Sequence, residues 1–133
     1  MTASAPIPRA NARLTLGAYG EALAAAHLLD AGYELLDRNW RCRDGEIDLV
    51  VRRGRILACV EVRTRRSSGF GHPLESITPS KLGRMRRVAL AWRAAHPEIA
   101  GALRLDVIAV RCVEGCAPEI VHLDGIGDEG ACA

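Results

Sequence analysis

The sequence predicts a single α/β domain, a mixed β-sheet with helices packed against it. The chain has 133 residues, of which 49% are hydrophobic, and this suits one domain with a sizeable core. Two segments carry apolar residues at helical spacing, and five shorter segments are strand-like. The expected order is therefore α-β-β-β-α-β-β. The elements are a helix over 15–31, strands over 33–41, 46–52 and 56–64, a helix over 79–96, and strands over 103–113 and 119–123.

The first helix is indicated by an apolar stripe with the spacing of successive helical turns. The stripe consists of Leu16, Tyr19, Leu23 and His27. Thr15 is the expected N-cap, and Gly32 ends the helix. Glu21 lies at the polar edge of the stripe, so its carboxylate is available to a site beside the helix.

The second helix has clear start and stop signals. Thr78 caps it, Pro79 occupies its first turn, and Pro97 ends it. Its expected buried face consists of Leu82, Met85, Val88, Ala89 and Trp92. The basic residues of this helix therefore project from its other faces.

The two strands between the helices are predicted to form a hairpin that turns at Gly54. If Gly54-Arg55 is a two-residue loop, Arg53 faces Ile56, and the numbers of paired residues sum to 109. Asp48 then lies opposite Glu61, with Cβ atoms roughly 5 Å apart. A four-residue loop keeps this pairing, whereas a three-residue loop with a bulge shifts one acid relative to the other.

Alternation along these strands predicts two different faces. One face is expected to be continuous core and consists of Ile47, Leu49, Val51, Ile56, Ala58, Val60 and Val62. The other consists of Glu46, Asp48, Val50, Leu57, Cys59, Glu61 and Arg63, with its polar groups at the end away from the turn. The sequence therefore predicts that the acids share one end of one face.

Two carboxylates so close together repel each other, and a divalent cation relieves the repulsion. Mg²⁺ binds one or two carboxylates together with waters and substrate phosphates. Asp48 and Glu61 are therefore the expected ligands of Mg²⁺ or Mn²⁺, with Glu46 and Glu21 in the outer shell. The chemistry predicted is metal-assisted phosphodiester hydrolysis.

A purely structural explanation of the same acids is a set of salt bridges. Glu46 or Glu61 would then pair across the strands with Arg63 or Arg65. The expected register favours the metal site, because it places two acids together on an otherwise apolar hairpin.

Positive charge is concentrated in the middle of the chain. Residues 52–93 contain eleven Lys or Arg and two acids, a net charge of +9, although the whole chain carries only +2. This distribution fits a nucleic acid, with DNA as the expected partner. The residues expected to bind it are Arg65, Lys81, Arg84 and Arg87. The alternative is a solvated, arginine-rich helix face without a ligand.

The remaining segments define the expected boundaries. Residues 1–14 are interpreted as a flexible arm, 15–124 as the domain, and 125–133 as a flexible acidic tail. No membrane-spanning segment is expected, because no run of 18 residues is apolar throughout. The five cysteines show no metal-ligand spacing, which predicts reduced thiols in a cytoplasmic protein.

Several motifs resemble those of the YraN-like family, small bacterial proteins of unproven function. The motifs are Gly17-x-x-Gly20-Glu21, Asn39-Trp40-Arg41, Gly45-Glu46-Ile47-Asp48-Leu49-Val50, Val60-Glu61-Val62-Arg63-x-Arg65 and Lys81, and the resemblance covers about residues 14–124. It implies a restriction-endonuclease-like fold of the PD-(D/E)xK superfamily, similar to Holliday-junction resolvases. It also implies catalytic roles for Asp48, Glu61, the residue at position 63, and Glu21.

The chain departs from this family pattern at one position. The usual Lys after Glu-Val is Arg63 here, and an arginine stays protonated, so it cannot accept a proton as a general base. We therefore expect metal binding with slow or undetectable cleavage.

Three functional classes remain open at this point. The first is a metal-dependent endonuclease on structured or branched DNA, in repair, recombination or uptake. The second is a catalytically weak or inactive nucleic-acid-binding module on the same fold, and the third is an RNA-processing factor. A homodimer is compatible with each of them.

Overall fold

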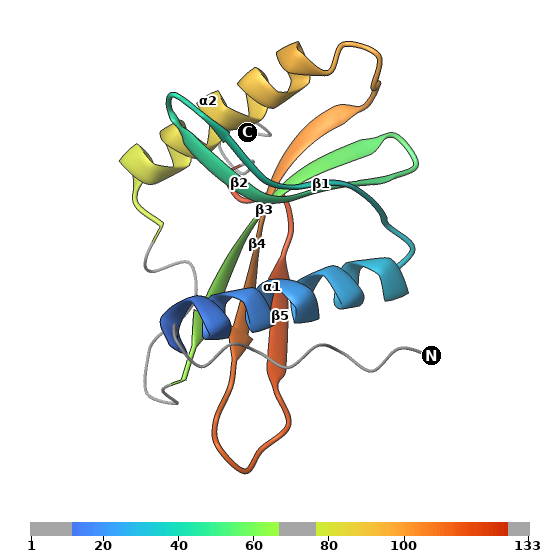
Figure 1. The fold of residues 1–133 in the computed structure, drawn as a ribbon. Coiled ribbons are helices and arrows are strands. Elements are labelled where there is room, and N and C mark those ends of the chain that lie inside the picture. Colours follow the sequence, from blue (N-terminus) through green and yellow to red (C-terminus); the bar gives the residue numbers. More distant parts are fainter. Residues whose placement is uncertain (1–11, 67–76, 128–133) are drawn as a thin grey trace.

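The fold is a mixed α/β domain with the expected order of elements (Figure 1). The computed structural model describes residues 12–66 and 77–127, with the side chains of residues 12–15 excepted. Its elements are α1 (Ala12–Asp30), β1 (Glu34–Cys42), β2 (Gly45–Arg53), β3 (Ile56–Arg65), α2 (Pro79–Ala95), β4 (Ala102–Arg111) and β5 (Glu119–Leu123). The predicted class and element order are thus confirmed.

The strands form one five-stranded sheet in the order β1-β2-β3-β4-β5. Strands β3 and β4 are parallel, and the other neighbouring pairs are antiparallel. The parallel pair requires a crossover connection, and α2 lies in it. Strand β3 therefore lies at the centre of the sheet, and it carries Glu61 and Arg63.

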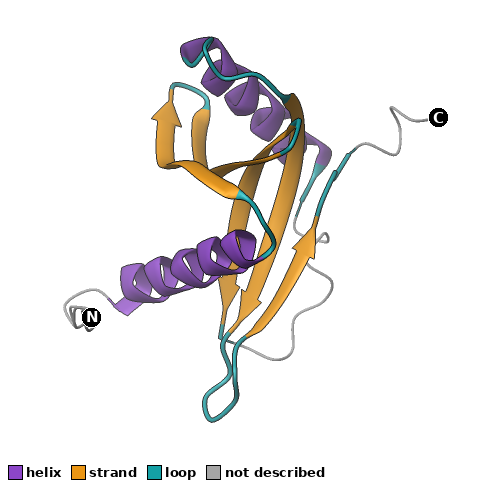
Figure 2. Ribbon diagram, turned by 90° about the vertical axis from the view of Figure 1, so that its right-hand side faces the viewer, coloured by secondary structure: helices purple, strands orange, loops and turns teal. Residues whose placement is uncertain are grey.

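Each face of the sheet is covered by one helix, and Figure 2 shows the two helices on different sides of the strands. Helix α1 packs its fully buried Ala24 and Leu28 on a cluster with Leu49 and Val60. Helix α2 covers the other face, where Trp92 is fully buried. The alternation expected along β2 and β3 is observed over most of their length.

Ile47 is the exception to the expected alternation. It was expected on the same face as Leu49, but it belongs to the core cluster under α2, together with Val50. Ile47 lies beyond the last regular pair of β2 and β3, Leu49 with Val60, so the alternation set by that pairing does not extend to it. On the neighbouring strand β1, Asn39 adopts a left-handed backbone conformation, with φ of 53°, between the residues that pair with Ile47 and Leu49.

The domain extends beyond both expected boundaries. Helix α1 begins at Ala12, within the segment 1–14 that was interpreted as an arm. At the other end, Ile126 is buried, and its backbone N–H donates to the Leu105 carbonyl at 2.8 Å. Residues 125–127 therefore pack in the domain, and the rest of the expected acidic tail lies outside the described residues.

Helix α1 approaches β3 closely because of one glycine. A Cβ atom at Gly20 would lie 1.9 Å from Oγ1 of Thr64, a distance that no side chain can accept. Any larger residue would push the helix away from the strand. Gly20 thus sets the position of its neighbour Glu21 relative to the acids of the hairpin.

Candidate metal and nucleic-acid site

The predicted hairpin register is confirmed from the turn as far as Leu49 and Val60, whereas the predicted pair of Asp48 with Glu61 is not among the paired residues. Strands β2 and β3 pair Arg53 with Ile56 and continue regularly to Leu49 with Val60, so paired numbers sum to 109. Beyond that pair, the Asp48 side chain binds the partner strand, and its Oδ2 accepts a hydrogen bond of 2.8 Å from the Val62 backbone N–H. This hydrogen bond fixes the Asp48 carboxylate against β3, one residue from Glu61.

Asp48 and Glu61 line one open groove between the hairpin and α2. The groove is open to solvent, and its other lining residues are Gly45, Glu46, Lys81, Arg84, Met85 and Val88. Acids therefore form one wall and the first turns of α2 form the other. The geometry brings two predicted metal ligands and two predicted nucleic-acid-binding residues to one place.

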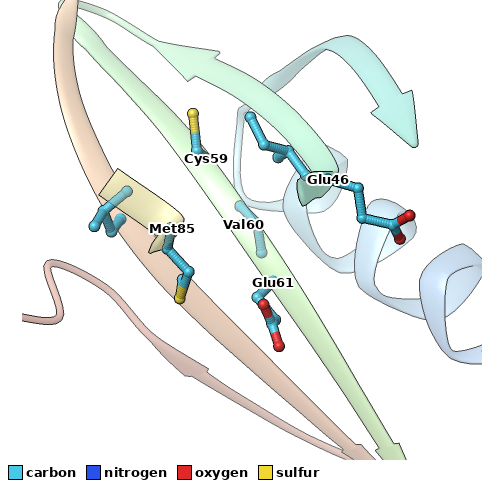
Figure 3. A pocket seen from close by; sticks show the side chains of 7 residues that line it. Glu46, Cys59, Val60, Glu61 and Met85 are labelled. Carbon is cyan, nitrogen blue, oxygen red and sulfur yellow. The ribbon is translucent and has the colours of Figure 1, made fainter. Parts of the chain in front are cut away.

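A small pocket adjoins this groove and shares Glu46, Glu61 and Met85 with it. Figure 3 shows the side chains that line this pocket. Met85 of α2 faces β3 there, and the Glu61 carboxylate lies at the edge of the pocket. The Glu46 carboxylate points away from the other lining side chains, and it forms a salt bridge of 3.0 Å with Arg41 of β1. Glu46 therefore lines the groove, and its charge also raises the pKa of Asp48.

The Asp48 carboxyl is electrostatically strained. Its burial raises the pKa and outweighs the Val62 hydrogen bond, which lowers it. The negative charges of Glu21, Glu61 and Glu46 raise it further, to about 7 from an ordinary 3.8. Four acids from α1, β2 and β3 thus influence one another, and a nearby cation would relieve their repulsion.

Glu61 has two cationic partners within the described residues. Arg63 Nε lies 2.7 Å from Glu61 Oε2, and Lys81 Nζ lies 3.3 Å from the same oxygen. The predicted salt bridge of Glu61 with Arg63 is therefore present, although it runs along one strand and not across two. Both cations contact the same oxygen, Oε2.

The basic wall is formed by the start of α2. Thr78 caps the helix as predicted, and its Oγ1 accepts a hydrogen bond of 3.1 Å from the Lys81 N–H. The Arg84 side chain passes over Gly45, where a Cβ would lie 3.5 Å from the Arg84 Cδ. Arg87 is exposed, and its Nε lies 4.0 Å from Oδ1 of Asp44 in the β1–β2 turn.

Arg65 and Glu21 complete the set of predicted residues. Arg65 is exposed at the end of β3, where its side chain has an interaction partner. Glu21 is half-buried on α1 and acts on Asp48 through its charge. Neither residue lines the groove between the hairpin and α2.

The donor set bears directly on whether a metal ion fits this groove. Within residues 12–66 and 77–127, no three His, Cys, Asp or Glu side chains gather closely enough to hold a metal. An ion would therefore rest on the Asp48 and Glu61 pair, with waters and phosphate completing its coordination. Hard oxygen donors in that number suit Mg²⁺ or Mn²⁺, which require few protein ligands.

Two features of the site were not predicted from the sequence. One is the Val62 N–H that holds Asp48, because a backbone donor carries no residue-specific signal. The other is the left-handed Asn39 on the strand beside Asp48. The sequence did contain a signal for the left-handed backbone at position 39, because asparagine adopts this conformation more readily than most residues.

Comparison with known proteins identifies a family over most of the chain. The model of Uncharacterised protein family UPF0102 matches residues 20–110. A UPF0102 protein of Beutenbergia cavernae is 48% identical over 117 residues, which cover 88% of this chain and 99% of the relative. Another from Leifsonia xyli subsp. xyli is 49% identical over 111 residues, with coverage of 84% and 94%. None of the helices in the described residues is long and apolar enough to cross a membrane.

Proposed function

The chain belongs to the uncharacterised protein family UPF0102, the YraN-like family, and we propose that it is a metal-dependent, endonuclease-like protein that binds nucleic acid. One observation carries the proposal. Asp48 and Glu61, on neighbouring strands, line a single groove opposite Lys81 and Arg84 of α2. Acids that can bind a metal ion thus face basic residues that can bind a phosphate. Metal-assisted hydrolysis of a phosphodiester requires both.

The proposed metal ligands are Asp48 and Glu61. Asp48 offers its Oδ1 while Oδ2 accepts the Val62 hydrogen bond, and Glu61 offers its Oε1 while Oε2 pairs with the two cations. When bound there, Mg²⁺ or Mn²⁺ would polarise the scissile phosphate and activate a water molecule. Binding would also relieve the repulsion that raises the pKa of Asp48.

The proposed substrate is nucleic acid, with structured or branched DNA in first place. The basic residues of α2 and the end of β3 would contact backbone phosphates, a mode of binding that does not depend on base sequence. The resemblance of the hairpin motif to the PD-(D/E)xK pattern supports DNA as the substrate. An RNA substrate would use the same phosphate contacts.

A second candidate is a nucleic-acid-binding module with weak or no activity. Its support is the environment of Glu61, whose Oε2 is already neutralised by Arg63 and Lys81. Arg63 also cannot act as a general base. This candidate predicts binding of metal and DNA without detectable cleavage.

Calorimetric titration with Mn²⁺ tests the metal site directly. Wild type should bind one ion, and Asp48→Asn should weaken the affinity at least about tenfold, since a charged ligand is lost. Asp30→Asn is the matched control, because Asp30 is an exposed acid at the end of α1. Cleavage of a branched DNA in Mn²⁺ then separates the two candidates. Equal Mn²⁺ binding by wild type and Asp48→Asn would contradict the proposal.

A further inference from the structure

Arg63 and Lys81 contact the same oxygen of Glu61 but differ in their access to the groove. The Lys81 side chain is 32% exposed and lines the groove together with Asp48 and Glu61. The Arg63 side chain is only 16% exposed and is not among the lining residues. Of these two cations, Lys81 is therefore the one that a phosphate in the groove can reach.

The hydrogen bonding of Arg63 also indicates that its guanidinium is less accessible than the Lys81 ammonium. Its Nε and Nη2 atoms are buried and have no hydrogen-bond partner, although Nε lies 2.7 Å from Glu61 Oε2. The N–H is thus not directed at the carboxylate, and the pair is held by charge. A buried guanidinium of this kind neutralises Glu61 from within the protein, and its Nε and Nη2 atoms are not accessible to a substrate.

The chemistry of the two groups fits these positions. An ammonium carries three donors on a flexible stem, so it can bind a carboxylate and a phosphate oxygen at once. Lys81 also lies in the first turn of α2, which contains no acid to compete for it. The backbone N–H of Lys81 is held by Thr78, and this fixes the point from which the side chain extends.

We propose, on the basis of the function proposed above, that Lys81 is the residue that contacts the phosphodiester at the acid groove, and that Arg63 is a positioning residue for Glu61. Lys81 donates to a non-bridging phosphate oxygen while it remains beside Glu61. Arg63 supplies a fixed charge that holds the Glu61 carboxylate in place. The cation that stabilises charge on the phosphate thus comes from α2 and not from β3.

The experiment measures binding of a fluorescent DNA with splayed single-stranded arms, in Mg²⁺ and over a range of salt concentrations, with intact DNA verified on a gel. Lys81→Gln should weaken binding about tenfold, as expected for the loss of one charge-assisted contact. It should also make the slope of log affinity against log salt shallower by about 0.7 to 0.9, the value for one phosphate. Lys81→Arg should retain most of the slope.

Arg63→Gln should leave the salt slope unchanged, because Arg63 touches no phosphate. Arg63→Lys should restore any affinity that Arg63→Gln loses, and it remains informative if Arg63→Gln folds poorly. Arg86→Gln is the matched control, since it removes one exposed charge from α2 on the side away from the groove. It should change neither affinity nor slope by as much as Lys81→Gln does.

The opposite pattern would overturn the assignment and leave the proposed function intact: Arg63→Gln would lower the slope, and Lys81→Gln would behave like Arg86→Gln. If wild type binds no DNA at any salt concentration, the proposed function fails, and the assignment of Lys81 fails with it.

Discussion

Asp48 on β2 and Asp106 on β4 belong to the same sheet, but their surroundings are opposite. Asp106 is fully buried and is compensated within the chain, by Arg104 Nε and Nη2 at 2.9 Å each, His122 Nε2 at 2.8 Å and the Gly125 N–H at 3.1 Å. Burial raises its pKa, but the hydrogen bonds from His122, Arg104 and Gly125 outweigh burial and hold the pKa below its ordinary value. Asp48 has one backbone donor and three acids around it, and its pKa is about 7.

The difference between these aspartates separates a structural carboxylate from a functional candidate. The partners of Asp106 join β4 to β5 and to the segment that follows it, and Arg104 also donates to the Tyr33 hydroxyl at 2.6 Å. Groups of the same chain thus compensate the buried charge of Asp106. The pKa of Asp48 is instead raised, by burial and by three neighbouring acids, and groups with such shifted pKa values gather at functional sites.

The largest expected effect is the loss of stability when Asp106 is removed. Asp106→Ala leaves Arg104 and His122 without their buried partner, so the free energy of unfolding should fall by about 3–5 kcal/mol. Asp48→Asn should change it by at most about 1 kcal/mol, because the amide relieves repulsion and can still accept from Val62. Urea unfolding of both variants measures the contrast. Similar losses in the two variants would erase the distinction between the sites.

The next largest effect is expected on the affinity for DNA. Reversing both Arg84 and Arg87 to Glu should weaken DNA binding at least about tenfold and reduce its salt dependence, because fewer phosphates are neutralised. Both residues are exposed, so the fold should tolerate the change. Arg55→Glu, in the exposed β2–β3 turn, is the control and should have a smaller effect. Binding that is insensitive to salt would contradict a phosphate-binding role.

A smaller effect is the pH dependence of stability, which should have opposite signs at the two aspartates. Folded Asp48 has a pKa of about 7 against an ordinary 3.8, so the folded state holds its proton more tightly. Its contribution to stability is present at low pH and is lost as the pH rises from about 4 to about 7. The pKa of Asp106 is lowered, so its contribution is instead lost as the pH falls below 3.8.

Urea unfolding of wild type and Asp48→Asn at about pH 4.5 and about pH 8 measures the first of these contributions. Wild type should lose stability relative to the variant as the pH rises, and saturating Mn²⁺ should reverse that loss. Parallel stability curves for the two proteins would show that the Asp48 carboxyl is not strained.

The hairpin could be predicted because its determinants are local. Gly54 sets the turn, and the turn sets the register, which holds from Arg53 and Ile56 to Leu49 and Val60. The side chain of Ile47 could not be placed in the same way, since Ile47 lies beyond the last regular pair of the hairpin, Leu49 with Val60. Alternation rules assume a regular partner strand and fail where the regular pairing ends.

The environment of each charge was harder to predict than its position. Asp106 pairs with Arg104, two residues away on the same strand, but its contact with His122 depends on the pairing of β4 with β5. Likewise, Lys81 reaches Glu61 only because α2 packs across the hairpin. Burial and long-range ion pairs follow from tertiary packing, which residue spacing along the chain does not determine.

If the acids of the hairpin form a divalent-cation site, a crystal soaked in Mn²⁺ should show the ion there. We expect an anomalous peak between Asp48 and Glu61, roughly 2.1 Å from one oxygen of each carboxylate, with Asp106 unaffected. A peak elsewhere, or none at this position at a saturating Mn²⁺ concentration, would show that these acids do not bind the ion.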